Sequence, residues 1–186
     1  MKNKKTIYII IVIIAVIVIA AVAFFAIRAL SSKNEKVNVD KVYRLELMDE
    51  KIEAPDIQFL DMNDNIHQLS DFRGKTVIVN FWAIFCPPCI EELPDFNKAV
   101  KVLEDKNTVI IAINVTEGKS DIIDFVNNAD LHQLSMYIDI NGNASQTYGI
   151  DTIPRTLIID EDGFIRSAAR GAVTYDDLIH IADELN

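Results

Sequence analysis

The sequence predicts an α/β fold in which a mixed central sheet is flanked by helices on both faces. Residues 76–83 (TVIVNFWA) and 108–115 (TVIIAINV) are continuous apolar runs rich in β-branched side chains, which is typical of strands buried on both faces. The stretch between them, from about Pro87 to Glu104, has a helical pattern. Two further strand-like runs flank a turn at 161–163, and a helical segment follows them. Alternating strands and helices that end in a hairpin and a helix indicate this architecture.

The other elements follow in order along the chain. Residues 57–75 alternate apolar and polar side chains around Asn63-Asp64-Asn65, which predicts a β-hairpin before the first buried strand. After the second buried strand, we expect a helix at 120–130 capped by Ser120, a strand at 135–140, a short helix at 144–149, strands at 155–160 and 164–170, and a last helix capped by Thr174.

The first thirty residues differ in composition from the rest of the chain. Ile7–Ile27 contains no charged residue, and about 20 apolar residues in a helix span the roughly 30 Å of a bilayer core. We therefore expect a single transmembrane anchor at 1–30, a polar tether at 31–50 and one domain with its own core at 51–186. Residues 21–23 (AVA) are similar to a signal-peptide cleavage site, so a cleaved leader is the alternative.

The charge distribution predicts the side of the membrane and restricts the partners. Lysines at positions 2, 4 and 5 favour a cytoplasmic N-terminus, so we expect a single-pass cell-membrane protein with an extracytoplasmic domain. All 28 acidic residues but only 14 of the 18 basic ones follow residue 30, which gives this part a formal charge of −14. Such a charge repels nucleic acid and anionic lipid headgroups.

The chain has two cysteines, Cys86 and Cys89, separated by two prolines. A structural zinc site normally takes four ligands, and the three histidines show no ligand spacing, so the sequence does not favour a metal and we expect no cofactor. A bridge between residues three apart restrains little of the unfolded chain, which argues against a structural crosslink. The spacing therefore indicates a pair that exchanges between dithiol and disulfide.

The position of Cys86 at the predicted start of a helix favours a reactive thiolate, because the helix N-terminus carries unpaired amides and positive partial charge. Pro87 and Pro88 suit the first helical turn but remove two possible N–H donors, which leaves the amide of Cys89 as the nearest backbone donor. We expect a less stabilised thiolate, and a less oxidising pair, than in strongly oxidising oxidoreductases. Pro94 either kinks this helix or ends it at Leu93.

Two segments together resemble the membrane-anchored, extracytoplasmic thioredoxin-like proteins of the TlpA/ResA group in the AhpC/TSA and redoxin superfamily. They are APDIQFLDMNDNIHQLSDFRGKTVIVNFWAIFCPPCIEELPDF and YGIDTIPRTLIIDEDGFI, and the resemblance covers roughly residues 52–186. It implies a thioredoxin-like fold and thiol–disulfide exchange. It further implies that Cys86 attacks, that Cys89 resolves the mixed disulfide, and that Pro154 is a cis proline facing the pair.

The resemblance also suggests which other residues take part. Glu92 matches a glutamate that members of this group place near the active site, and it lies one helical turn from Cys89, where it could accept or relay a proton. The alternative is an exposed helix carboxylate such as Glu91. Asn80 stands where cytosolic thioredoxins hold a buried acid. Residues expected to contact the partner are Trp82, Phe85, Pro87, Ile153 and Arg155, although Phe85 replaces the usual tryptophan, and Arg155 either brings charge to the site or faces water.

The sequence thus predicts a membrane-tethered thiol–disulfide oxidoreductase that reduces disulfides in exported proteins, with apocytochrome c as one candidate partner. By resemblance, its electrons come from an integral-membrane thiol carrier. A disulfide-forming oxidase would use the same residues in reverse. A peroxidase of the peroxiredoxin type is less favoured, because Ala83 stands where a threonine precedes the peroxidatic cysteine. A binding module without redox activity is the remaining alternative.

Overall fold

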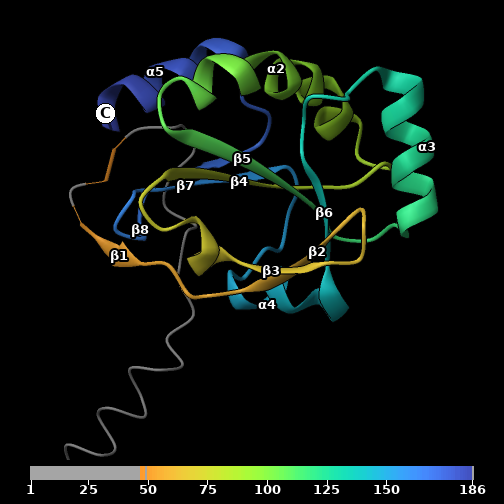
Figure 1. Ribbon diagram of the computed structural model, residues 1–186, viewed down its shortest axis with the longest axis horizontal. Coiled ribbons are helices and arrows are strands. Elements are labelled where there is room, and N and C mark those ends of the chain that lie inside the picture. Colours follow the sequence, from red (N-terminus) through yellow and green to blue (C-terminus); the bar gives the residue numbers. More distant parts are fainter. Residues whose placement is uncertain (1–46, 49, 186) are drawn as a thin grey trace, which may run out of the picture. The chain divides into compact units, whose positions relative to one another are not determined.

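The computed structural model describes residues 47–185 apart from residue 49, so the expected anchor at 1–30 lies outside the described residues. Among the residues described, eight strands form one sheet in the order β1-β8-β7-β4-β5-β6-β2-β3 (Figure 1). The strands are β1 (Ile52–Glu53), β2 (Gln58–Asp61), β3 (Ile66–Gln68), β4 (Thr76–Trp82), β5 (Thr108–Asn114), β6 (Met136–Asp139), β7 (Arg155–Ile159) and β8 (Phe164–Arg170). β4, β5 and β6 run parallel and the other neighbours are antiparallel, so the predicted mixed sheet is confirmed.

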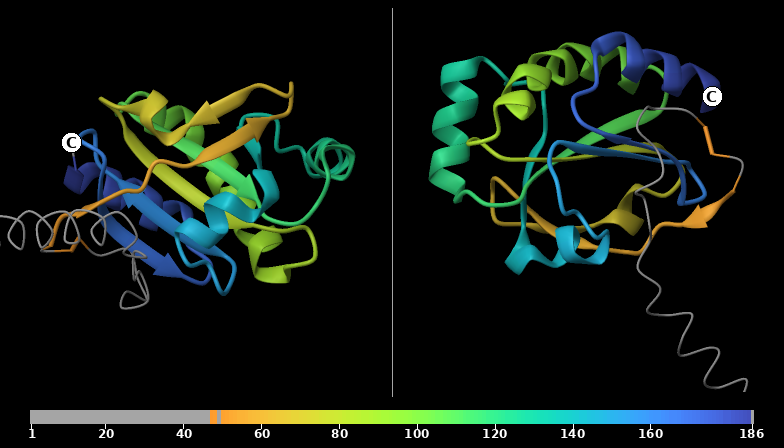
Figure 2. Two further views of the ribbon diagram at one scale, coloured as in Figure 1. Left: turned by 90° about the horizontal axis from the view of Figure 1, so that it is seen from below. Right: turned by 180° about the vertical axis from the view of Figure 1, so that it is seen from behind.

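Helices cover both faces of this sheet. They are α2 (Pro87–Glu104), α3 (Lys119–Ala129), α4 (Asn143–Thr147) and α5 (Tyr175–Leu185), with short 3-10 turns η2 (Leu69–Phe72) and η3 (Ile140–Gly142). Figures 1 and 2 show α2 and α5 side by side over one face, α3 to the side of this pair, and α4 beneath the other face.

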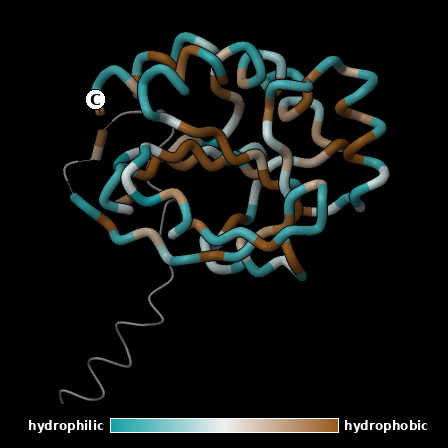
Figure 3. Tube along the Cα trace, in the orientation of Figure 1, coloured by the Kyte–Doolittle hydropathy of each residue, from teal (hydrophilic) through white to brown (hydrophobic). Residues whose placement is uncertain are grey.

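The core has two layers because successive side chains of a strand point to opposite faces. In β4, Ile78 and Trp82 pack under α2 and α5 with Cys86 and Cys89, whereas Phe81 packs on the α4 side. Every residue of β4 is buried, and the central strands are correspondingly apolar along their length (Figure 3). The continuous apolar runs at 76–83 and 108–115 therefore correctly predicted the central strands β4 and β5.

Several local expectations have a clear outcome. β2 and β3 are antiparallel neighbours joined by residues 62–65, and β2 also pairs with β6. α3 begins after Gly118, which is its N-cap, so the expectation that Ser120 caps this helix was wrong. α2 continues through Pro94 to Glu104, so the alternative that it ends at Leu93 was also wrong. No helix within the described residues is long and apolar enough to span a membrane.

Candidate active site

The cysteine pair lies where the central strand β4 passes into helix α2. β4 ends at Trp82, three residues form a short loop, and Cys86 is the N-cap of α2. Pro87 and Pro88 occupy the first two helical positions, as predicted, and both are exposed. Proline fits there because the first amides of a helix have no intrahelical partner.

Cys86 and Cys89 are joined by a disulfide. The amide of Cys89 donates a hydrogen bond to Cys86 Sγ at 3.3 Å, which confirms it as the backbone donor expected from the sequence. Cys86 is 6% exposed and Cys89 is fully buried. Cys86 therefore keeps a small exposed surface and Cys89 has none, so Cys86 is the cysteine of the pair that a partner can approach.

Glu92 is buried on α2, one turn beyond Cys89, and is only 3% exposed, whereas Glu91 is exposed. Asn80 Nδ2 donates to Glu92 Oε1 at 2.8 Å, and the amide of Val173 donates to Glu92 Oε2 at 2.8 Å. Burial raises the pKa of the Glu92 carboxyl from an ordinary 4.5 to about 7, against the lowering effect of these two hydrogen bonds. This carboxyl can therefore give and take a proton near neutral pH.

Asn80 connects this carboxyl to the neighbouring strand. Its Nδ2 group also donates to Thr156 Oγ1 in β7 at 3.1 Å, while its buried Oδ1 accepts no hydrogen bond from the described residues. Rotation of the amide would turn Oδ1 toward Glu92 and let it accept the proton of a neutral carboxyl. Asn80 thus suits both protonation states of Glu92.

Pro154 lies at the same end of the sheet as the cysteines. The antiparallel register pairs Arg155 with Phe81, so the preceding residues lie beside the end of β4. The Ile153–Pro154 bond is cis, as the resemblance implied. Pro154 is buried and Ile153 is half-buried.

Of the residues expected to contact a partner, Phe85 is 67% exposed and Pro87 is exposed, and both adjoin Cys86.

Two expected partner contacts lie inside the protein instead. Trp82 has no exposed surface and packs against Phe125, with ring centroids 5.6 Å apart. Arg155 also has no exposed surface, so neither direct contact with a partner nor the alternative that it faces water holds. It belongs to the face of β7 that packs on the α4 side, away from the cysteines, and Asp151 Oδ1 lies 3.9 Å from its guanidinium. Neither residue presents a surface to a partner in this structure.

Sequence reasoning missed Asn114, the last residue of β5, and Glu117, which lies between β5 and α3; together they hold the loop before Cys86. Glu117 Oε1 accepts hydrogen bonds from the amides of Ile84 and Phe85 at 3.0 and 3.4 Å. Asn114 Nδ2 donates to Glu117 Oε2 at 2.7 Å. The sequence did contain one signal for this pair: an asparagine ends a buried strand, and an acidic residue follows it three positions later.

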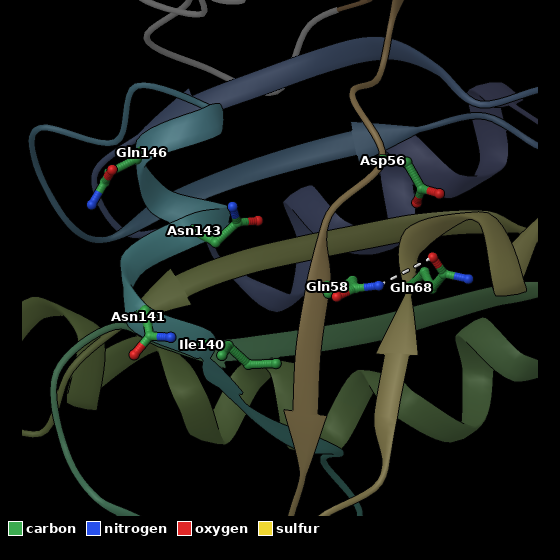
Figure 4. Close-up of a pocket in the computed structure, with 7 residues that line it drawn as sticks. All are labelled: Asp56, Gln58, Gln68, Ile140, Asn141, Asn143 and Gln146. Atoms are coloured by element: carbon green, nitrogen blue, oxygen red, sulfur yellow. Dashed lines mark hydrogen bonds between the residues drawn. The ribbon is translucent and has the colours of Figure 1, made fainter.

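A separate polar hollow of about 490 Å³ lies between the β2–β3 pair and α4 (Figure 4). Amide side chains dominate its lining, and on the β2–β3 side Gln58 Nε2 donates a hydrogen bond to Gln68 Oε1 at 3.5 Å. The lining residues are Asp56, Gln58, Gln68, Ile140, Asn141, Asn143 and Gln146. Neither cysteine lines this hollow, so it is not part of the redox site.

Comparison with known proteins agrees with this site. Residues 51–168 match the AhpC/TSA family. The chain is 32% identical over 125 residues to the thiol-disulfide oxidoreductase ResA of Geobacillus thermodenitrificans, covering 67% of this chain and 71% of the relative. It is 32% identical over 147 residues to ResA of Bacillus cereus, covering 79% and 78%.

Solved structures share the fold. The thioredoxin domain of a thiol-disulfide oxidoreductase from Bacteroides vulgatus superposes with a TM-score of 0.62 at 24% identity, covering 72% of this chain and 96% of that domain. This likeness confirms a thioredoxin-like α/β fold. With a disulfide at the start of α2 and homologues that share this activity, the chain belongs to the AhpC/TSA family and is a thiol–disulfide oxidoreductase of the ResA type.

Proposed function

We propose that this protein is a membrane-tethered, extracytoplasmic reductase of disulfides in exported proteins. The observation that carries the proposal is the unequal burial of the pair: Cys86 has exposed surface at a helix N-terminus, whereas Cys89 is sealed one turn from a carboxyl that titrates near neutrality. Exchange with a partner disulfide can then begin only at Cys86. The mixed disulfide is resolved by Cys89 from inside the protein.

The exchange proceeds in two balanced steps. The Cys86 thiolate attacks one sulfur of the partner disulfide, so that a mixed disulfide forms and the second partner sulfur leaves as a thiolate that takes a proton from water. Deprotonated Cys89 then attacks Cys86 Sγ, which forms the intramolecular disulfide and releases the first partner sulfur. Two electrons pass from the cysteine pair to the partner.

Glu92 serves the second step. Cys89 is fully buried, which disfavours its thiolate, so a base within the protein is needed to take its proton. Glu92 is the buried acid one turn away on the same helix, and its pKa of about 7 lets it accept that proton at neutral pH. Asn80 and the Val173 amide hold the carboxylate that results from proton release.

The partners follow from the proposed location. An apolar run at Ile7–Ile27 and the lysines before it support a domain held outside the cytoplasm, where exported proteins carry disulfides. The oxidised pair must be reduced again after each cycle, and an integral-membrane thiol carrier is the proposed donor. An apocytochrome c with paired cysteines is one candidate substrate.

The trapping experiment uses Cys89→Ser in the full-length chain expressed in living cells. Without Cys89 the mixed disulfide on Cys86 cannot be resolved, so partners should accumulate as bands that disappear on reduction. Cys86→Ser is the matched control and should trap none. Recovery of no disulfide-linked protein with Cys89→Ser, or equal recovery with both variants, would contradict the proposed reaction, and a predominantly oxidised wild-type pair in cells would favour the oxidase direction.

A further inference from the structure

The backbone around Cys86 offers its sulfur few hydrogen-bond donors. Between residues 84 and 89, the amides of Ile84 and Phe85 point to Glu117, and the amide of Cys86 donates to the carbonyl of Ala83 at 3.3 Å. The two prolines that follow have no N–H group. Over this stretch only the amide of Cys89 donates to Cys86 Sγ. The environment of the attacking sulfur is therefore set largely by how Glu117 holds the loop.

Glu117 is fixed in place by its own neighbours. Asn114 Nδ2 donates to its Oε2 at 2.7 Å, while Asn114 Oδ1 accepts the amides of Thr116 and Glu117 at 3.0 and 2.8 Å. Asn114 itself is fully buried at the end of β5. The amide of Val115 also donates to the carbonyl of Trp82 at 3.1 Å, which joins the β5–α3 loop to the end of β4. The carboxylate is thus a rigid part of the site and not a free surface group.

We propose that Glu117 is a positioning residue for the proposed reaction, which fixes the backbone before Cys86 and by its negative charge disfavours the Cys86 thiolate. The carboxylate accepts the amide of the residue next to Cys86, so its charge lies close to the attacking sulfur. A nearby like charge disfavours ionisation of a thiol. The two hydrogen bonds to Glu117 also engage the amides of Ile84 and Phe85, so neither of these amides donates to the sulfur. Both effects lower the fraction of Cys86 thiolate, so the reduced pair reacts more slowly with disulfides that are not its substrates.

Other charged groups near Cys86 act differently. On α2, Glu91 is exposed to solvent and the Glu92 carboxyl accepts a hydrogen bond from Asn80. At the start of α3, Lys119 is paired with Asp64 at 2.6 Å. Arg155 lies on the other face of the sheet, and Asp151 interacts with Arg170 at 3.0 Å. Glu117 is the carboxylate among these that hydrogen-bonds the loop leading into Cys86.

The test measures the pKa of Cys86 in the full-length chain carrying Cys89→Ser, from the rate of iodoacetamide alkylation against pH. Glu117→Gln keeps an oxygen acceptor for the loop but removes the charge, so the Cys86 pKa should fall by about 0.5 to 1 unit. Below the pKa, that shift raises the thiolate fraction roughly three- to tenfold. Glu117→Asp keeps the charge and should stay closer to the parent. Asp121→Asn, an exposed charge change on α3, is the matched control and should leave the value unchanged.

The Cys86 titrations of the Glu117 variants either support or overturn the proposed role of Glu117. An unchanged Cys86 pKa in Glu117→Gln, or an equal shift in Asp121→Asn, would overturn it, because a purely structural clamp would alter stability without moving this titration. If Glu117→Gln does not fold, Glu117→Ala against Glu117→Asp makes the same comparison, with a lowered pKa expected only for alanine. Alkylation needs no physiological partner. The titration therefore stands even if the trapping experiment recovers none, and the two failures are distinguishable.

Discussion

Burial makes the Glu92 carboxyl a weaker acid in the folded protein than in the unfolded chain. Its pKa rises from 4.5 to about 7 because desolvation outweighs the hydrogen bonds from Asn80 and Val173. Between these values the folded state holds a proton that the unfolded chain has released, so the free energy of unfolding falls as pH rises through this window. The full shift corresponds to at most about 3 kcal/mol. The protein therefore gives up some stability at neutral pH to keep a titrating group beside Cys89.

Glu92→Gln should remove this pH dependence. Glutamine does not titrate, so the oxidised wild-type protein should lose up to about 3 kcal/mol of unfolding free energy, relative to the variant, between pH 5 and pH 8. Urea unfolding at both pH values measures the difference, in which contributions shared by the two proteins cancel. Glu91→Gln changes the same charge at an exposed neighbour and should behave like wild type. Parallel pH profiles for wild type and Glu92→Gln would mean that this carboxyl does not titrate as the fold implies.

Residue roles were predictable from sequence only where chain spacing decides them. Glu92 is one turn from Cys89 in any helix, so helical spacing together with the family resemblance favoured it over Glu91. The side of the sheet that Arg155 faces depends on the strand register relative to the cis proline, and the sequence alone did not give it. Glu117 reaches Ile84 across 33 residues of chain, a contact that only the paired strands β4 and β5 create.

At the scale of elements, the start of α2 controls the cysteine pair. An N-cap side chain accepts hydrogen bonds from the amides at the second and third helical positions. Here the third position is Cys89, which donates to Cys86 Sγ, and the second is Pro88, which has no amide hydrogen. Of the two backbone amides from which an N-cap side chain can accept, only that of Cys89 is therefore present for the Cys86 sulfur.

Pro88→Ala should restore the missing donor. A hydrogen bond to a charged group contributes about 1.5–3 kcal/mol, so the pKa of the Cys86 thiol should fall by about 1 to 2 units, and the pair should become more oxidising in equilibrium with glutathione. Pro87→Ala is the control, since an amide at the first helical position points away from the cap side chain. An equal response of both variants would show that backbone flexibility, and not the added donor, sets the potential.

Most elements were predictable because their patterns are local. The buried strands β4 and β5 stand out as apolar runs, and β8 and α2 end where the patterns end. Ser120 misled because a glycine one residue before Lys119 satisfies the same cap position. Pro94 was ambiguous because its missing hydrogen bond weakens an isolated helix, whereas the packing of Leu93 and Phe96 against the sheet holds α2 together.

At the scale of the molecule, the fold assembles one site from distant segments. Glu92 on α2 meets Asn80 of β4 and the Val173 amide before α5, and Asn80 in turn reaches Thr156 of β7. No local sequence pattern predicts that these four residues lie together. The motif Cys-Pro-Pro-Cys and the segment before Pro154 pointed to it only through their resemblance to a known family, which supplied the tertiary arrangement that spacing could not.

The proposed tether determines where this site can act, and it can be tested on the intact chain. A helix of the 21 residues in the proposed anchor Ile7–Ile27 would be about 30 Å long, enough to span a bilayer. The full-length protein should remain with membranes after alkaline carbonate extraction, and protease added outside the cytoplasmic membrane should digest the domain at 51–186. Ile17→Arg places a charge in the middle of the run at an insertion penalty of about 2.5–3.5 kcal/mol, so it should lower the membrane-bound fraction, whereas Ile17→Leu should not. A mature N-terminus just after Ala23 would instead identify a cleaved leader, and a protease-resistant domain in sealed cells would place the cysteines on the cytoplasmic side.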